Sequence, residues 1–242
     1  MGRIVTLADD RSIKVWDAET GKCLLFIDQI FGSERYGGGV GTCDVTSDGS
    51  LIICEIEYGG MKKIFDGFTG ALIMDVEDTQ NTSHSLKFSP NSRMFLNGNI
   101  EVWSCSNLTA RHSTDAIPVD VDRNKFKPRK AATLPGIRYA CLASTFSPDN
   151  KRVLCGDVNG SIYVWDIAAA CMSYGDEVKC RGGGRILHLS YCRDQSFFAV
   201  GTDCALEIWD AASTVCLDIS IAHSSAVCGV EFSCKRGSQL VR

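Results

Sequence analysis

Ser161-Ile-Tyr-Val-Trp-Asp166 is the stretch that decides the fold, because four variants of it occur elsewhere in the chain. The variants are Ser12-Ile-Lys-Val-Trp-Asp17, Met61-Lys-Lys-Ile-Phe-Asp66, Asn99-Ile-Glu-Val-Trp-Ser104 and Ala205-Leu-Glu-Ile-Trp-Asp210. Each alternates apolar and polar residues and ends in an aromatic residue, usually followed by Asp, which is the pattern of a half-buried strand. Five strands of one design predict five copies of one structural unit.

A second shared feature precedes the aromatic anchors: a strand that ends in a turn of the aromatic-Ser-Pro-Asp type. It occurs as Phe88-Ser-Pro-Asn91 and Phe146-Ser-Pro-Asp149, and in weaker form as Val45-Thr-Ser-Asp-Gly49, Tyr191-Cys-Arg-Asp194 and Phe232-Ser-Cys-Lys235. Pro, Asp, Asn and Gly favour tight turns through their backbone preferences. The 15 to 20 residues between such a turn and the next anchor leave room for one further strand.

In the fourth unit this further strand is predicted at Arg152–Gly156, followed by a turn at Asn159-Gly160. After the anchor comes a short turn and then an apolar run, such as Cys23–Ile27 or Val215–Ile219. Each unit is therefore predicted to be four short antiparallel strands in a meander. A small twisted sheet of this kind cannot bury both faces alone, so the copies are expected to stack.

These features resemble the WD-repeat family of β-propellers. The resemblance rests on the Trp-Asp ends at Trp16, Trp165 and Trp209, with weaker anchors at Phe65 and Trp103, and on the Phe-Ser-Pro turns. It implies an all-β fold, a β-propeller of four-stranded antiparallel blades with about five repeats, and one WD-repeat domain that spans residues 1–242.

In this family, a repeat is held together by a hydrogen-bonded set: a His before the first strand, a Ser or Thr in the second, an Asp in the tight turn, and the Trp indole. The Asp position, six residues before the Trp, is occupied by Asp10 and Asp203 and more weakly by Asn159. The His position is occupied only by His223. The resemblance therefore implies a structural hydrogen-bond set that consists of Thr6, Asp10, Trp16, Asp203, Trp209 and His223.

Two alternatives are open for the chain ends. In one, a terminal strand within residues 223–242, Val227–Phe232, pairs with Ile4–Ala8 and completes the first blade, so that a five-bladed ring closes and leaves no exposed sheet edge. In the other, which we favour, the chain is a fragment of a larger propeller. The two alternatives differ in whether His223 and Trp16 share a blade.

The gap between Trp103 and the fourth unit contains an insertion at about residues 112–137. Its charge density and Pro predict a loop. The loop is either a docking arm for an acidic partner or phosphate, or a solvated insertion. Family members often bind partners on the face of the turns between the second and third strands, where Asp10 and Arg11 are expected. The candidate partner-binding residues are thus Arg11, Arg123, Lys125, Phe126, Lys127, Arg129 and Lys130.

No constellation for catalysis, cofactor binding or metal binding is found in the sequence. The 4 His are never at metal-ligand spacing, and the 13 Cys are spread along apolar strand positions without a C-x-x-C pair. Gly37–Gly39 and Gly182–Gly184 are not followed by the Lys-Ser or Lys-Thr of a phosphate-binding loop and are expected between repeats. We expect no enzyme activity and no cofactor.

Composition restricts the partners. With 25 Lys plus Arg against 29 Asp plus Glu, the chain has a net charge of −4, so we expect no binding to nucleic acid or to anionic membranes. We expect an intracellular protein, in the cytoplasm rather than the nucleus, that is monomeric or part of a larger assembly. The predicted function is that of a protein-interaction scaffold or recognition module, and the partners are other proteins. The alternatives are a regulatory or sensor fragment of a larger multidomain protein and, less favoured, a propeller enzyme.

Overall fold

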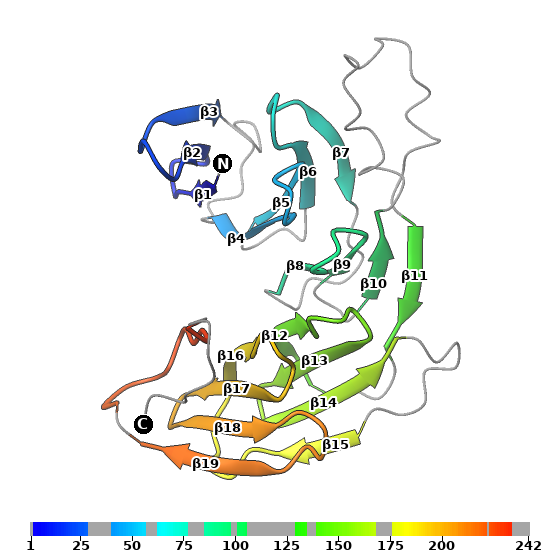
Figure 1. Cartoon of the computed structure of the whole chain (residues 1–242), viewed down its shortest axis with the longest axis vertical. Helices are drawn as coiled ribbons and strands as arrows, with labels where there is room; N and C mark the ends of the chain where they lie inside the picture. The colour runs from blue at the N-terminus through cyan, green and yellow to red at the C-terminus, as the bar shows by residue number, and fades with distance from the viewer. Residues whose placement is uncertain are drawn as a thin grey trace. The chain divides into compact units, whose positions relative to one another are not determined.

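The five aromatic-ended stretches are strands in the structure. A computed structural model describes residues 2–28, 40–56, 62–76, 85–97, 101–105, 129–134, 139–167, 176–221 and 223–233, which form strands and turns with no helix in those ranges. The stretches correspond to β2 (Ile13–Asp17), β6 (Lys62–Asp66), β10 (Glu101–Ser104), β14 (Ser161–Asp166) and β18 (Leu206–Asp210) (Figure 1). The prediction of five equivalent strands is confirmed.

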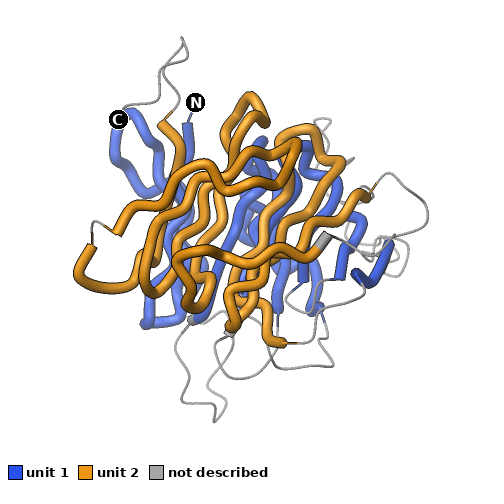
Figure 2. The backbone as a smooth tube through the Cα atoms, turned by 90° about the horizontal axis from the view of Figure 1, so that it is seen from below, with its two compact units in different colours: residues 1–135 blue, residues 136–242 orange. Residues whose placement is uncertain are grey.

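Residues 1–135 and 136–242 form two compact units (Figure 2). Among the described residues, the first unit contains a three-stranded and two four-stranded sheets, and the second contains two four-stranded sheets. Neighbouring strands are consecutive in sequence and antiparallel, so every sheet is a meander. The predicted all-β class and blade-like sheets are confirmed, whereas the single domain over residues 1–242 stays a prediction.

The first unit begins with the three-stranded sheet of β1 (Arg3–Leu7), β2 and β3 (Cys23–Ile27). The second sheet consists of β4 (Val40–Val45), β5 (Leu51–Ile56), β6 and β7 (Leu72–Val76). The third consists of β8 (Lys87–Phe88), β9 (Met94–Asn97), β10 and β11 (Arg129–Thr133). β11 corrects the prediction of a loop at residues 112–137, because part of this insertion pairs with β10 and satisfies its backbone groups there.

The second unit contains the fourth and fifth sheets. The fourth sheet consists of β12 (Cys141–Phe146), β13 (Arg152–Asp157), β14 and β15 (Asp176–Lys179). The fifth consists of β16 (Ile186–Tyr191), β17 (Phe197–Thr202), β18 and β19 (Cys216–Ser220). The predicted strand at Arg152–Gly156 and the turn at Gly160, which has φ +74°, are both observed.

Within each unit the sheets stack through apolar faces. In the second unit, Leu154 and Ile162 of the fourth sheet share a core with Phe198 and Trp209 of the fifth. Each of these side chains is at most 3% exposed. Burying one such side chain contributes about 1.5–3 kcal/mol, which explains why the small sheets stack.

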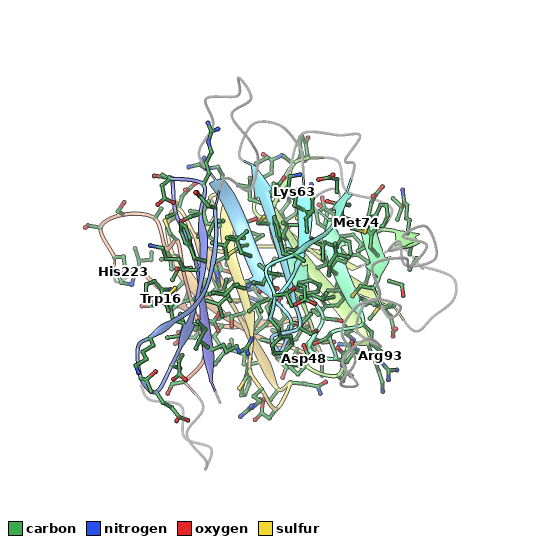
Figure 3. All side chains as sticks on the ribbon, turned by 90° about the horizontal axis from the view of Figure 1, so that it is seen from above. Trp16, Asp48, Lys63, Met74, Arg93 and His223 are labelled. Carbon is green, nitrogen blue, oxygen red and sulfur yellow. The ribbon has the colours of Figure 1, made fainter. Side chains whose placement is uncertain are left out.

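The aromatic-Ser-Pro-Asp turns form as predicted. In the fourth sheet, the Ser147 hydroxyl donates to Asp149 Oδ1 at 2.6 Å and accepts the Arg152 N–H at 2.8 Å. Asp149 Oδ1 also accepts the Lys151 N–H at 3.0 Å, and Asn150 adopts a left-handed conformation with φ 62°. In the first unit, Asp48 and Arg93 belong to the equivalent turns of the second and third sheets (both are labelled in Figure 3). These two turns are joined by a 3.1 Å hydrogen bond from the Ser47 N–H to Ser92 Oγ.

The predicted strand Val227–Phe232 is wrong: these residues form no strand. The Val227 N–H donates to the Thr202 carbonyl at 2.9 Å, and the Val230 N–H donates to His188 Nδ1 at 3.3 Å. The segment therefore packs on the fifth sheet through isolated hydrogen bonds rather than a ladder. β1 is an edge strand whose one neighbour among the described strands is β2. Closure of a ring by the two ends stays a prediction.

Candidate protein-binding site

One end of the second unit has a surface built from two turns and the loop between them. We call residues 157–160, 180–185 and 202–205 the turn platform. Residues 157–160 join β13 to β14, residues 202–205 join β17 to β18, and residues 180–185 join β15 of the fourth sheet to β16 of the fifth. Asn159 and Asp203, which the family resemblance assigns to turns between second and third strands, lie in the first two of these segments.

The first turn of the platform is organised by Asp157, a residue that the sequence did not single out. Its side chain is 0% exposed, and Oδ1 accepts the N–H groups of Asn159 and Ser161, each at 2.8 Å. Its Oδ2 accepts the Tyr163 hydroxyl at 3.2 Å. Asp157 thus holds the turn in place, whereas Asn159 is exposed and the assignment of Asn159 as the turn carboxylate equivalent is wrong. A buried carboxylate needs such donors, because an unpaired one is costly.

The second turn is held by Thr202 and by an ion pair. Thr202 Oγ1 accepts the Cys204 and Ala205 N–H groups at 3.1 and 2.9 Å. Asp203 accepts two hydrogen bonds from the Arg185 guanidinium, from Nε at 2.8 Å and from Nη2 at 3.1 Å, and one from the Arg185 N–H at 3.1 Å. The Arg185 hydrogen bonds lower the pKa of Asp203 below its ordinary value. Asp203 therefore links its turn to residues 180–185, which we call the intersheet loop because they join the fourth sheet to the fifth.

The intersheet loop is fastened to both turns. The Cys180 N–H donates to the Gly160 carbonyl at 2.9 Å, and the Gly182 N–H donates to Glu207 Oε1 at 2.5 Å. A Cβ on Gly160 would lie 2.8 Å from the Gly184 carbonyl oxygen, so the two segments approach as closely as glycine permits. The platform is therefore one interlocked surface rather than three independent loops.

Most exposed side chains of the platform and its border are polar, and three of them are basic; Cys204 is also exposed. Asn159, Lys179, Arg181 and Arg185 are exposed. Lys179 donates to the Asn159 carbonyl at 3.4 Å and lies 3.9 Å from Glu177. Arg181 has no ion pair among the residues that the structure describes. A planar guanidinium held on a fixed backbone can bind a carboxylate, a backbone carbonyl or an aromatic face of another protein.

The predicted hydrogen-bond set is brought together only in part. In the first sheet, the Trp16 indole donates to Thr6 Oγ1 at 2.8 Å, and Asp10 Oδ1 accepts the Ser12 N–H at 3.0 Å (Trp16 is labelled in Figure 3). Asp10 therefore holds its turn, and the Ser12 hydrogen bonds lower its pKa. His223 is exposed in the second unit, and its predicted membership of this set stays a prediction.

The Trp209 indole has a partner that sequence reasoning missed. Its Nε1 donates to Glu207 Oε2 at 2.9 Å, and Glu207 is 0% exposed. The Trp103 indole likewise donates to Glu101 Oε2 at 3.0 Å. The signal was visible in the sequence, because both repeats contain Glu two residues before the Trp, which places both side chains on the same face of the strand.

The Asp that follows the aromatic anchor caps the next turn. Asp17 Oδ1 accepts the N–H groups of Glu19 and Thr20 at 2.8 and 2.9 Å. These backbone hydrogen bonds lower the pKa of Asp17. Asp66 and Asp210 accept equivalent pairs of N–H groups in the second and fifth sheets. The Trp-Asp pair thus joins a packing anchor to a turn cap.

Of the predicted partner-binding residues, the structure describes Arg11, Arg129 and Lys130. Arg123, Lys125, Phe126 and Lys127 lie outside the described residues. Arg129 and Lys130 lie in β11, and Lys130 forms an ion pair with Glu101 of the neighbouring strand β10. Arg11 is in the turn between β1 and β2, with φ 66°. Lys130 therefore has a partner within its own sheet, and a binding role for the basic residues stays a prediction.

Within the described ranges, no group of three or more His, Cys, Asp or Glu side chains could hold a metal ion. The described cysteines are free thiols, several of them buried in the sheets. Nowhere in the described part of the chain is a helix long and apolar enough to cross a membrane.

Stacked antiparallel meanders with aromatic anchors, capped turns and an interlocked turn surface define a β-protein built from structural repeats. The sequence model of the WD domain, G-beta repeat, matches residues 132–166, a range that includes β12, β13 and β14. This match supports the resemblance to the WD-repeat family that was found in the sequence. A comparison with the curated proteins found no match to the chain. WD-repeat domains are generally non-catalytic scaffolds that bind other proteins.

Proposed function

We propose that the chain is a protein-interaction module without a reaction of its own, and that a partner protein binds the turn platform. The observation that supports this proposal is the interlocking of residues 180–185 with both neighbouring turns. A surface that is already ordered loses little conformational entropy when a partner binds, so its exposed side chains can contribute fully to affinity.

The chemistry of the platform supports a protein partner rather than a small substrate. Its exposed groups include the guanidinium of Arg181, the guanidinium of Arg185, which Asp203 holds, and the amide of Asn159. Arg is among the residue types that contribute most binding energy at protein interfaces. The net charge of −4 disfavours nucleic acid as the partner. We further propose that the protein acts inside the cell, in the cytoplasm, as a monomer or in a larger assembly.

The same platform would serve a regulatory region of a larger multidomain protein. In that case, the partner would be a neighbouring domain of the same protein. Both forms of the proposal require the platform to be a binding surface, so one experiment tests them together.

The experiment compares Arg181→Glu with the matched variant Arg193→Glu, both as the whole chain expressed in its source cells. Arg193 is also exposed but lies in the turn between β16 and β17, at the opposite end of the fifth sheet. Proteins that copurify with the wild type are quantified by mass spectrometry. Partners should decrease by about tenfold or more with Arg181→Glu, which corresponds to about 1.4 kcal/mol, and should persist with Arg193→Glu. Equal recovery with both variants, provided that both unfold like the wild type in urea, would refute the assignment.

A further inference from the structure

Two cysteines of the second sheet lie directly opposite each other. Cys43 of β4 is the register partner of Cys54 of β5 in an antiparallel pair. Residues directly opposite on antiparallel strands have their side chains on the same face of the sheet. Both thiols accordingly pack with one apolar cluster, which also contains Val15 of β2 and Phe65 of β6.

The hydrogen-bond pattern between β4 and β5 makes Cys43 and Cys54 a non-hydrogen-bonded pair, the type in which opposite side chains are closer. The Thr46 N–H donates to the Leu51 carbonyl at 3.0 Å, so residues 46 and 51 form a hydrogen-bonded pair. Hydrogen-bonded and non-hydrogen-bonded pairs alternate along an antiparallel ladder. Cys43 and Cys54 are three steps away in the register and therefore form a non-hydrogen-bonded pair.

Non-hydrogen-bonded pairs have Cα atoms about 4.5 Å apart and the nearer side chains. Disulfides span Cα separations of about 4.4–6.8 Å. The strand pairing thus places the two Cα atoms at a separation that a disulfide can span without requiring either strand to move. Among the cysteines of the described strands, no other pair is directly opposite: Cys155, for example, faces Ser144 and Tyr163.

We propose that Cys43 and Cys54 are a thiol–disulfide modification site, at which exchange with a small disulfide such as oxidised glutathione forms a cross-strand bond. The two strands already place the thiols in register, and Cys43 offers the entry point because it is partly exposed whereas Cys54 is 0% exposed.

The exchange takes two steps. The Cys43 thiol loses its proton, and its thiolate attacks one sulfur of oxidised glutathione, whose S–S bond breaks and releases one glutathione thiolate that takes up a proton. The Cys54 thiol then loses its proton, and its thiolate attacks the Cys43 sulfur and releases the second glutathione in the same way. The two protein thiols lose two electrons, and oxidised glutathione gains them.

The burial of the two thiols predicts that the disulfide forms slowly. Burial raises the pKa of Cys43, and burial together with the neighbouring Cys43 raises the pKa of Cys54 to about 12. Because the thiolate is the reactive form, the exchange should accelerate as the pH rises. The bond would join β4 to β5 on the face that packs against the first sheet.

The test uses the purified, reduced whole chain incubated with excess oxidised glutathione at neutral and at mildly alkaline pH. Remaining thiols are alkylated, and the protein is digested with a protease that cleaves at Asp. Asp44 and Asp48 lie between the two cysteines, so the peptides of Cys43 and Cys54 separate unless a disulfide links them. The expected result is a linked peptide pair that forms faster at the higher pH and separates after reduction.

Two variants distinguish the proposed steps. Cys54→Ala should accumulate glutathione on Cys43, because the second thiol is missing, and Cys43→Ser should leave Cys54 unmodified. The exposed Cys204 and Cys228 report in every sample that the oxidant is active. The proposal is overturned if these two are modified while Cys43 and Cys54 of the wild type remain alkylated, or if the wild type keeps a stable glutathione adduct on Cys43. The wild-type peptides decide the result even if a variant does not fold.

Discussion

The buried carboxylate of Asp157 provides the most direct test of how the turn platform is held. Asp157→Ala removes the acceptor of three hydrogen bonds, from the N–H groups of Asn159 and Ser161 and from the Tyr163 hydroxyl. Asn159 is exposed, so water can replace the acceptor there. Ser161 is 1% exposed, so its N–H would remain as an unsatisfied buried donor at about 1–3 kcal/mol. The Tyr163 hydroxyl would lose one partner and keep its hydrogen bond with the Ser161 side chain. We expect Asp157→Ala to lower the free energy of unfolding by about 2 kcal/mol.

Asp157→Asn removes the negative charge of the side chain but keeps its shape and one acceptor oxygen. The amide oxygen can still accept both N–H groups, and the Tyr163 hydroxyl can accept a hydrogen bond from the amide nitrogen, so we expect a loss of only about 1 kcal/mol. Asn159→Ala is the matched control, expected within about 0.5 kcal/mol of the wild type. Urea unfolding followed by circular dichroism and by fluorescence, to which Trp165 contributes, measures all three. If the Ala and Asn variants of Asp157 lose equal stability, or if Asn159→Ala loses as much as Asp157→Ala, the role assigned to Asp157 is refuted.

Two further perturbations test the packing of the sheets. Gly156→Ala should cost about 1–3 kcal/mol in urea unfolding, because its Cβ would lie 2.2 Å from Cγ2 of the buried Ile186. Gly229→Ala meets no atom within 4 Å and serves as the control, so equal effects would contradict the close approach. Burial raises the pKa of Asp44, which lies 3.9 Å from Lys87, so its ionisation removes stability as the pH rises from the ordinary value of 3.8 through the raised pKa. Asp44→Asn should therefore gain stability relative to the wild type as the pH rises above about 4, and a pH-independent difference in urea unfolding would contradict this sign.

The third strands and their order could be predicted from sequence because their information is local. A strand of alternating apolar and polar residues that ends in an aromatic residue and a capping Asp specifies, within a few residues, which face of the strand is buried and where the next turn begins. In the structure the aromatic residue also stacks on the second strand, as with Phe198 and Trp209, whose ring centroids are 5.9 Å apart. The apolar run Cys23–Ile27 was placed correctly for the same reason.

The errors arose where long-range pairing decides the structure. β11 has the sequence Arg-Lys-Ala-Ala-Thr, which resembles a solvated loop, and it becomes a strand because β10 offers an unpaired edge. Conversely, Val227–Phe232 has a strand-like pattern but binds β16 and β17 through isolated contacts. Asp157 was missed because the turn position was counted from the Trp, whereas the buried side chain lies at the end of the second strand.

The fifth repeat shows that the structural frame and the candidate binding surface are physically coupled. One carboxylate oxygen of Glu207 accepts a hydrogen bond from the Trp209 indole, and the other accepts one from the Gly182 N–H of the platform. Because one buried carboxylate fixes both groups, the position of residues 180–185 depends on how the aromatic anchor is held. The residue two positions before the anchor differs between repeats, being Lys14, Glu101, Tyr163 or Glu207 beside a Trp. Variation at this position, which is buried in the fourth and fifth repeats, can therefore change the orientation of a surface loop without any change in the exposed side chains. This gives the repeat a second route to a new binding surface besides substitution at the turn tips.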